Sequence, residues 1–426
     1  MFLKLTRPLP IIALALAMPA LAQNDSAART EDSTATAPVA APNGGDIVVT
    51  ARSLADTAAA LAACIARGCP PDEDIAATLA HAENQFIEGD YRDARGTMLS
   101  SLRRNREHSA QFPVEVSDLQ RANGRVAAHL GERSAYQLAV LDMRDTLREY
   151  LPADDPRILA AQIEVADSRA RLGYPDEARD SFVNIAERAD GLGLARVAAF
   201  ARIRQAGFDI PRDRSARITS RVTAARAQLA RIADDAVHVG ADIALQAEVT
   251  LARIDREEGN MTRTIALVQR FANGQGSRRP LLISGDPIRL PDEDTRSPDQ
   301  SGDEGGGGNV LAQMQTVNVN NRWIDVGFWI NGDGRVSDFE VLRSDGDTGW
   351  ARYVATSVNS RVYTPIRSED GLQSQGFYIV ERYTLIADYR TAGDCTGSHI
   401  RCRSSRLRVE RMDLTPDDGA RPTSAS

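Results

Sequence analysis

The chain has 426 residues, 42% hydrophobic and 26% charged, a balance typical of a globular protein long enough for two domains with separate cores. The formal net charge of −8, without long basic runs, argues against nucleic acid and anionic membranes as partners. Lys4 is the only lysine. Once a leader containing it is removed, the chain can have no P-loop lysine, Schiff base or Ser-Lys dyad.

Residues 1–22 have the features of a secretory signal peptide. Lys4 and Arg7 precede an apolar run from Leu9 to Met18, and Ala20-Leu21-Ala22 provides a small-residue cleavage site. The run is too short to cross a bilayer comfortably, which takes about 20 apolar residues. We therefore expect a chain that is exported to the periplasm, begins at Gln23 after cleavage and has no membrane span.

Residues 23–52 are predicted to be disordered, because Ala, Thr, Pro, Ser and Asn predominate. One β-branched run interrupts the segment, DIVVTAR, whose first six residues are Asp46, Ile47, Val48, Val49, Thr50 and Ala51. This run resembles the TonB box of outer-membrane receptors, although the plug and barrel strands of a receptor are missing. It is expected to add as a strand to the sheet of a partner, a binding mode called β-augmentation. The alternative is a short, aggregation-prone segment that has no partner.

A helical repeat is predicted for residues 53–273. Gly89, Gly131 and Gly173 lie 42 residues apart, each between two amphipathic helical patterns and shortly before an alanine. A weaker counterpart at Gly259 lies about two periods further on, and the missing turn is expected at residues 207–215. Glycine ends a helix and a small alanine lets helices approach closely. Each turn therefore predicts a helix pair.

The predicted helices include Leu54–Arg67 as a lead helix, Ile75–Ile87 with Tyr91–Arg104, and Arg157–Leu172 with Pro175–Ala189. This array resembles the tetratricopeptide family, although its period exceeds the usual length of about 34 residues and the signature positions are only partly filled. The resemblance implies a solenoid with a concave surface that binds proteins. An ordinary irregular helical bundle is the alternative.

Residues 274–309 are predicted to be a flexible linker. The part from Pro291 to Asn309 is acidic and rich in glycine, which is typical of an unstructured connection. The part before it, Arg278 to Leu290, contains one apolar cluster and is expected to be extended.

The stretch from Trp323 to Ile366 predicts strand, turn, strand and helix. Its first run alternates with the period of a half-buried strand, with Ile324, Val326, Phe328 and Ile330 on one face and Asp325, Gly327 and Trp329 on the other. The turn Asn331–Gly334 suits a hairpin, so Gly334–Leu342 should pair back on the first strand. A helix is expected from Thr348 and a third strand at Phe377–Tyr389.

This stretch, with its NGDGRVSDFEVLRSDGD run and its Tyr363-Thr364-Pro365 exit, resembles the C-terminal domain of the TonB energy-transducer family. The resemblance covers about Asn309 to Tyr389, and the chain departs from it at Val362 and Tyr363, where the family usually has tryptophan and phenylalanine. It implies a ββαβ module whose edge strand captures an extended peptide; any small α+β domain with a hairpin is the alternative. The candidate peptide-binding module comprises Trp323, Val326, Phe328, Val336, Phe339, Val341, Tyr383 and Leu385.

The four cysteines form two local pairs, Cys64 with Cys69 and Cys395 with Cys402. In an exported chain such pairs are typical of disulfides. A metal site at the second pair with His399 is conceivable, but the spacing matches no zinc pattern. Arginines alternate with apolar residues after Cys402 and suggest a last strand with a basic face, so the C-terminal domain is assigned to residues 310–414 and a disordered tail to 415–426.

The sequence therefore predicts a multidomain protein, with an all-α tetratricopeptide-like solenoid and a small α+β TonB C-terminal-like domain. We expect that the protein is not an enzyme, because the sequence contains no known nucleophile or metal motif. We also expect that it binds no cofactor or metal. The expected function is that of a periplasmic adaptor whose partners are proteins or extended peptides. A TonB-dependent receptor or another component of that transport system would be such a partner. The alternatives are an energy transducer anchored by an uncleaved leader, and an envelope hydrolase that uses the repeats as a scaffold.

Overall fold

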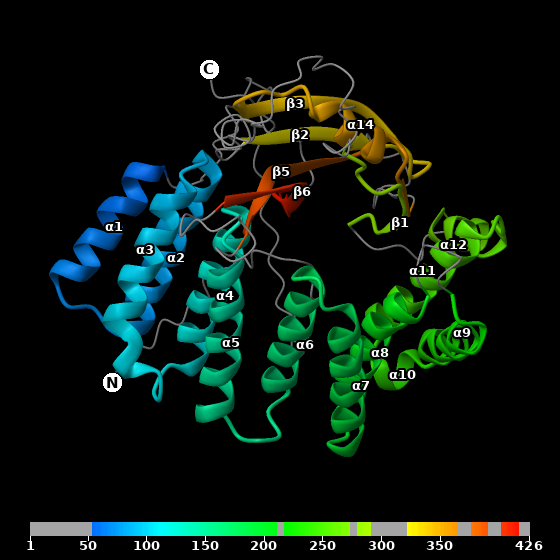
Figure 1. The fold of residues 1–426 in the computed structure, drawn as a ribbon, viewed down its shortest axis with the longest axis horizontal. Helices are drawn as coiled ribbons and strands as arrows, with labels where there is room; N and C mark the ends of the chain where they lie inside the picture. Colours follow the sequence, from blue (N-terminus) through cyan, green and yellow to red (C-terminus); the bar gives the residue numbers. More distant parts are fainter. Residues whose placement is uncertain are drawn as a thin grey trace, which may run out of the picture.

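The structure, a computed structural model, describes residues 53–210, 217–272, 279–290, 322–364, 376–390 and 402–416. Most of these residues are helical, and a small antiparallel sheet follows the helices in the chain (Figure 1). No helix in these ranges is both long enough and apolar enough to cross a membrane. The predicted leader, the DIVVTAR run and the glycine-rich part of the predicted linker lie outside the described residues.

The helices pack largely in chain order and follow one another in an arc (Figure 1). They are α1 (Leu54–Ala66), α2 (Pro71–Glu88), α3 (Tyr91–Asn105), the 3₁₀ turn η1 (Arg106–His108), α4 (Pro113–His129), α5 (Arg133–Tyr150), α6 (Pro156–Arg171), α7 (Pro175–Gly191), α8 (Ala195–Asp209), α9 (Thr219–Asp234), α10 (Ala236–Val239), α11 (Ala241–Glu257) and α12 (Thr262–Ala272). The helices predicted from the sequence are confirmed to within a few residues at their ends.

The glycine turns share one backbone geometry. Gly89, Gly131, Gly173 and Gly259 have φ angles of 93°, 71°, 92° and 90°. In each case the residue after the glycine donates its N–H to the carbonyl five residues before it, which is the helix-ending motif that favours glycine. Gly193, between α7 and α8, repeats the motif although the sequence pattern did not single it out.

The turn expected at residues 207–215 begins later than predicted, because α8 continues to Asp209. The largest core of the array runs from α6 to α11 and combines small alanines with Phe182 and aliphatic residues. Ala94 and Ala178, which follow two of the turns, are completely buried, and their small size allows the close helix approach expected at these places.

The sheet has the strand order β3-β2-β5-β6, and all neighbours are antiparallel. Its strands are β2 (Arg322–Ile330), β3 (Val336–Asp345), β5 (Phe377–Arg390) and β6 (Cys402–Asp413), and α14 (Ala351–Asn359) with the short β4 (Val362–Tyr363) lies between β3 and β5 in the chain. The predicted order of strand, turn, strand, helix and strand is confirmed, as is the last strand.

Part of the predicted linker belongs to the fold of the C-terminal region. Leu282–Ser284 forms β1, which pairs antiparallel with β4. Ile288 and Leu290 pack against the core of the sheet, while Ile283 packs against α11 and α12. The apolar cluster that suggested an extended link is thus a strand joining the far end of the array to the sheet, which lies across the open side of the arc (Figure 1).

The prediction that β2 is half-buried is wrong. Its apolar face, with Val326 and Phe328, packs with Val354 and Val358 of α14 as expected. Its other face is buried as well, with Asp325 only 1% exposed, because the ends of the first helices cover it. The sheet therefore lies between α14 on one side and the helical array on the other.

Candidate functional site at the junction of sheet and helices

The ends of α2, α4 and α6 form a row beneath the sheet. These helices end just before the three glycines that recur in the sequence, and their last residues contact β2, β5 or β6. His129 bonds to Thr384 of β5, and Arg171 forms an ion pair with Glu410 of β6 at 3.1 Å. The 42-residue spacing of these glycines thus goes with helix ends that one sheet can contact together.

Arg382 of β5 is the central side chain of this junction and is 0% exposed. Its Nε donates to Asp325 Oδ1 at 2.6 Å, and one terminal nitrogen donates to Asp325 Oδ2 at 2.8 Å. The guanidinium also donates to the main-chain carbonyls of Phe86 and Ile87, the latter at 2.6 Å, in the last turn of α2. These carbonyls lie at the negative end of the helix, where their oxygens can accept further hydrogen bonds, so a buried cation is well placed there.

The electrostatics keep Arg382 charged. Burial lowers the pKa of Arg382, but the hydrogen bonds to Asp325 and the attraction of neighbouring groups outweigh burial, and the pKa is raised overall. Arg343 of β3 adds a second cation, donating to Asp325 Oδ2 at 2.9 Å and to the Ile87 carbonyl at 3.1 Å. Asp325 therefore links three strands of the sheet and, through the arginines, the end of α2.

A hydroxyl on β5 joins two aromatic rings of the array. Thr384 Oγ1 lies 3.0 Å from the Tyr91 hydroxyl and 2.9 Å from His129 Nδ1. Burial, followed by the positive charges of Arg382, Arg171 and Arg408, lowers the pKa of His129 to about 3. Burial likewise raises the pKa of Tyr91 to about 12. Both rings are thus neutral at physiological pH.

Trp323 fills the space above the first glycine turn. A Cβ at Gly89 would lie 2.6 Å from Trp323 Nε1, closer than real contacts allow, and the positive φ of Gly89 independently disfavours a side chain. The Arg382 guanidinium lies 3.9 Å from the centroid of the Trp323 ring, so the indole is held between the array and a cation.

The candidate peptide-binding residues have different environments. Val326, Phe328, Tyr383 and Leu385 belong to the core that α14 covers, and Val336 and Phe339 pack against it. Trp323 is buried in the junction. Val341, on β3, is 41% exposed, and its neighbour Leu342 is 38% exposed. Of the eight residues, therefore, Val341 is the one that presents a large apolar surface to solvent.

Strand β3 forms one edge of the sheet and is irregular. In the described part of the chain, β2 is its only sheet neighbour. Compared with β2, β3 has one extra residue between Val341 and Arg343 and another between Ser337 and Glu340, where Asp338 has a positive φ of 52°. Such bulges limit pairing along an edge to short stretches.

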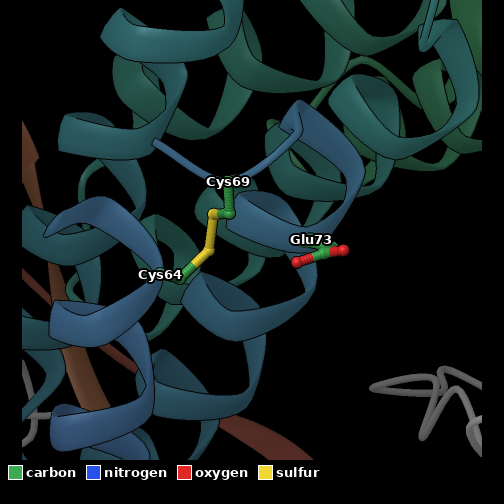
Figure 2. Close-up of side chains that lie close together, drawn as sticks. All are labelled: Cys64, Cys69 and Glu73. Atoms are coloured by element: carbon green, nitrogen blue, oxygen red, sulfur yellow. A yellow bond between two sulfur atoms is a disulfide. The ribbon is translucent and has the colours of Figure 1, made fainter. Parts of the chain in front are cut away.

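The predicted disulfide between Cys64 and Cys69 is present at the end of α1 (Figure 2). Ligand atoms of Cys64, Cys69 and Glu73 lie within 4.8 Å of one another, a grouping that could hold a metal if the sulfurs were thiolates. In the disulfide they are not, and the Glu73 carboxylate is paired with Arg67. The second predicted disulfide, between Cys395 and Cys402, lies outside the described side chains. The same is true of the TonB-box-like residues Asp46–Ala51.

Sequence reasoning missed the residues that join the two regions. Asp325 and Arg382 each interrupt an apolar strand, and two such opposite charges on strands of one small module were an available indication of a buried ion pair. His129 and Thr384 gave no comparable indication, because nothing in either local pattern links residues that are so far apart in the chain.

Comparison with known proteins gives little further guidance. No family model and no curated protein matches the chain. Among solved structures, the crystal structure of BtubC (BKLC) from P. vanneervenii is similar over 56% of this chain and 95% of its own, with 16% identity and a TM-score of 0.39. A likeness at that score carries neither a fold nor a function over to this chain.

Proposed function

We propose that the chain is a periplasmic adaptor in which a tetratricopeptide-like array carries a TonB C-terminal-like sheet, and that the edge strand β3 receives an extended peptide. The repeat assignment is supported by the equivalent helix-ending motifs at Gly89, Gly131 and Gly173. The assignment of the sheet is supported by the matching order of its elements. The localisation depends on the leader seen in the sequence.

The observation that supports peptide capture most is the way the sheet is covered. One face packs on α14 and the other on the ends of α2 and α4, so much of each face is already covered. At one edge, Glu410 and Met412 of β6 contact the array. At the other edge, β3 exposes Val341 and Leu342 beside main-chain groups that could pair with an added strand.

The two bulges in β3 favour a short ligand. A peptide could form a regular ladder only along a stretch between or beyond the bulges, so affinity would come from a few main-chain hydrogen bonds and one or two apolar side chains. A seven-residue β-branched run such as DIVVTAR has suitable length and composition. The ligand could be the chain's own segment from Asp46 to Arg52 or a similar segment of a receptor.

The test uses full-length protein in which Val48→Asp and Val49→Asp disable the internal segment. A fluorescent DIVVTAR peptide is titrated, and its anisotropy is followed. Val341→Lys should weaken binding about tenfold, because a charged edge opposes pairing. Leu138→Lys, at an exposed leucine on α5, is the matched control and should change nothing. A peptide with proline at its third position should bind less well, since proline removes an N–H donor. Absence of binding at about 1 mM peptide would contradict the proposal.

A further inference from the structure

A cavity of about 330 Å³ lies where the far end of the helical array meets β1. Helix α11 and Arg217, two residues before α9, form one wall, and β1 with the loop after it forms the other. The lining residues are Arg217, Arg253, Arg256, Glu257, Ser284, Gly285, Asp286, Pro287 and Arg289. The volume is in the range of small-molecule sites.

The charge of this cavity is opposite to that of the whole chain. Four arginines face two carboxylates in the lining, whereas the chain has a net charge of −8. Arg217 forms ion pairs with Glu257 at 3.6 Å and with Glu258 at 2.8 Å, so it partly offsets the acidic end of α11. Arg256 and Arg289 reach the cavity from opposite walls. Arginines on both walls of one cavity suit a solute with several carboxylate or phosphate groups.

Ser284 provides an independent indication of a ligand. The residue lines the cavity and is only 5% exposed, and its buried Oγ has no hydrogen-bond partner among the described residues. A buried hydroxyl without a partner is costly, so native proteins usually satisfy it with protein, water or a ligand.

The wall that bears Ser284 is held in place. Asp286 accepts a hydrogen bond at its main-chain oxygen from Ser357 Oγ at 2.6 Å and donates its N–H to Ser360 Oγ at 2.8 Å. Pairing of β1 with β4 fixes the preceding residues. The main chain at Ser284 is therefore fixed before any ligand arrives, which reduces the ordering cost of binding.

We infer that this cavity binds a small solute with two or more phosphate or carboxylate groups, held by Arg256 and Arg289 from opposite walls with Ser284 donating a hydrogen bond. Such a ligand would bridge the end of the helical array and the strand that leads to the sheet. The inference is independent of peptide binding at β3, because the cavity and the edge strand share no residue.

Isothermal titration of the full-length protein with pyrophosphate and, separately, with tricarballylate tests this inference at low ionic strength. We expect saturable binding of one molecule per chain for at least one of them; binding of pyrophosphate alone assigns phosphate groups, and binding of tricarballylate alone assigns carboxylates. Arg256→Gln with Arg289→Gln should weaken the binding at least about tenfold, since two charge-assisted contacts are lost. Ser284→Ala should weaken it by a smaller factor.

Arg148→Gln is the control, because Arg148 is an exposed arginine on α5 that pairs with Asp145, away from the cavity. It should bind like the unchanged protein, and thermal melting of every variant verifies folding. Two results would overturn the inference. One is absence of saturable binding by either anion up to about 10 mM. The other is equal affinity of the double arginine variant and the Arg148→Gln control, which would mean that the anion binds elsewhere.

Discussion

Arg382 and Asp325 form a two-point ion pair on adjacent strands, with Nε to Oδ1 at 2.6 Å and both side chains buried. The remaining donors of the guanidinium reach carbonyls at the end of α2. One arginine therefore connects two strands of the sheet to each other and also connects the sheet to the helical array. The C-terminal region is held against the array by these buried contacts.

Replacement of Arg382 by methionine should destabilise the protein strongly. The variant leaves the buried Asp325 with Arg343 alone and removes the hydrogen bonds from Arg382 to the Phe86 and Ile87 carbonyls, at a cost of about 3–5 kcal/mol. Urea unfolding followed by circular dichroism measures the change. The double variant Arg382→Met with Asp325→Leu should recover part of the loss, since no buried charge then lacks its partner. Equal stability of Arg382→Met and the unchanged protein would refute the role assigned to the pair.

Gly89→Ala should cost more than Gly173→Ala. Both glycines have nearly the same positive φ, so both substitutions carry a backbone penalty of about 1 kcal/mol. A Cβ at Gly89 would collide with Trp323, whereas nothing lies within 4 Å of a Cβ at Gly173. We expect an additional loss of about 1–3 kcal/mol at Gly89, together with altered tryptophan fluorescence. Equal losses for the two variants would show that Trp323 does not pack on this turn as described.

The buried His129 predicts a pH dependence of stability. Its pKa is about 3 in the folded protein and about 6.5 when unfolded, so the unfolded state binds more protons between these values. Its contribution is complete above pH 6.5 and is lost as the pH falls toward 3, by about 1.4 kcal/mol per pH unit. Comparison with His129→Gln between pH 5 and 7 isolates this contribution. Parallel stability profiles of the two proteins would mean that His129 is accessible to protons.

Reduction of the Cys64–Cys69 disulfide should have a modest effect. The bond closes a loop with a sequence separation of 5, and chain-entropy arguments assign such a short loop roughly 2 kcal/mol. The loss should be confined to the end of α1, which proteolysis with and without reductant can locate. Cys64→Ser with Cys69→Ser should behave like the reduced protein in both conditions; a further effect of reductant on that variant would point to another disulfide.

Local patterns predicted much of the fold. The helices around Gly89, Gly131 and Gly173 and the hairpin after Trp323 follow from glycine, proline and hydrophobic periodicity, which act over a few residues. The strand β1 was harder to predict, because its three residues pair with β4 far along the chain. Short strands are stabilised by their partners more than by their own sequence.

The junction could not be predicted from the same patterns. Asp325 alternates with apolar residues as an exposed position would, and its burial becomes evident only when Arg382 and the end of α2 lie beside it. The cavity lined by Arg256 and Arg289 is likewise a product of tertiary packing. Local periodicity predicts which face of a strand is apolar, but it does not predict that a second layer will cover the polar face.

We propose that β3 is the strand that receives a peptide. The most direct measurement is hydrogen–deuterium exchange of the full-length Val48→Asp, Val49→Asp protein with and without DIVVTAR peptide. We expect slower exchange of amides within Val336–Asp345, where an added strand would bond to the edge of β3 that faces away from β2, with little change in α4 or α6. Unchanged exchange along β3 at peptide concentrations that saturate binding, with protection appearing only on the helices, would contradict it.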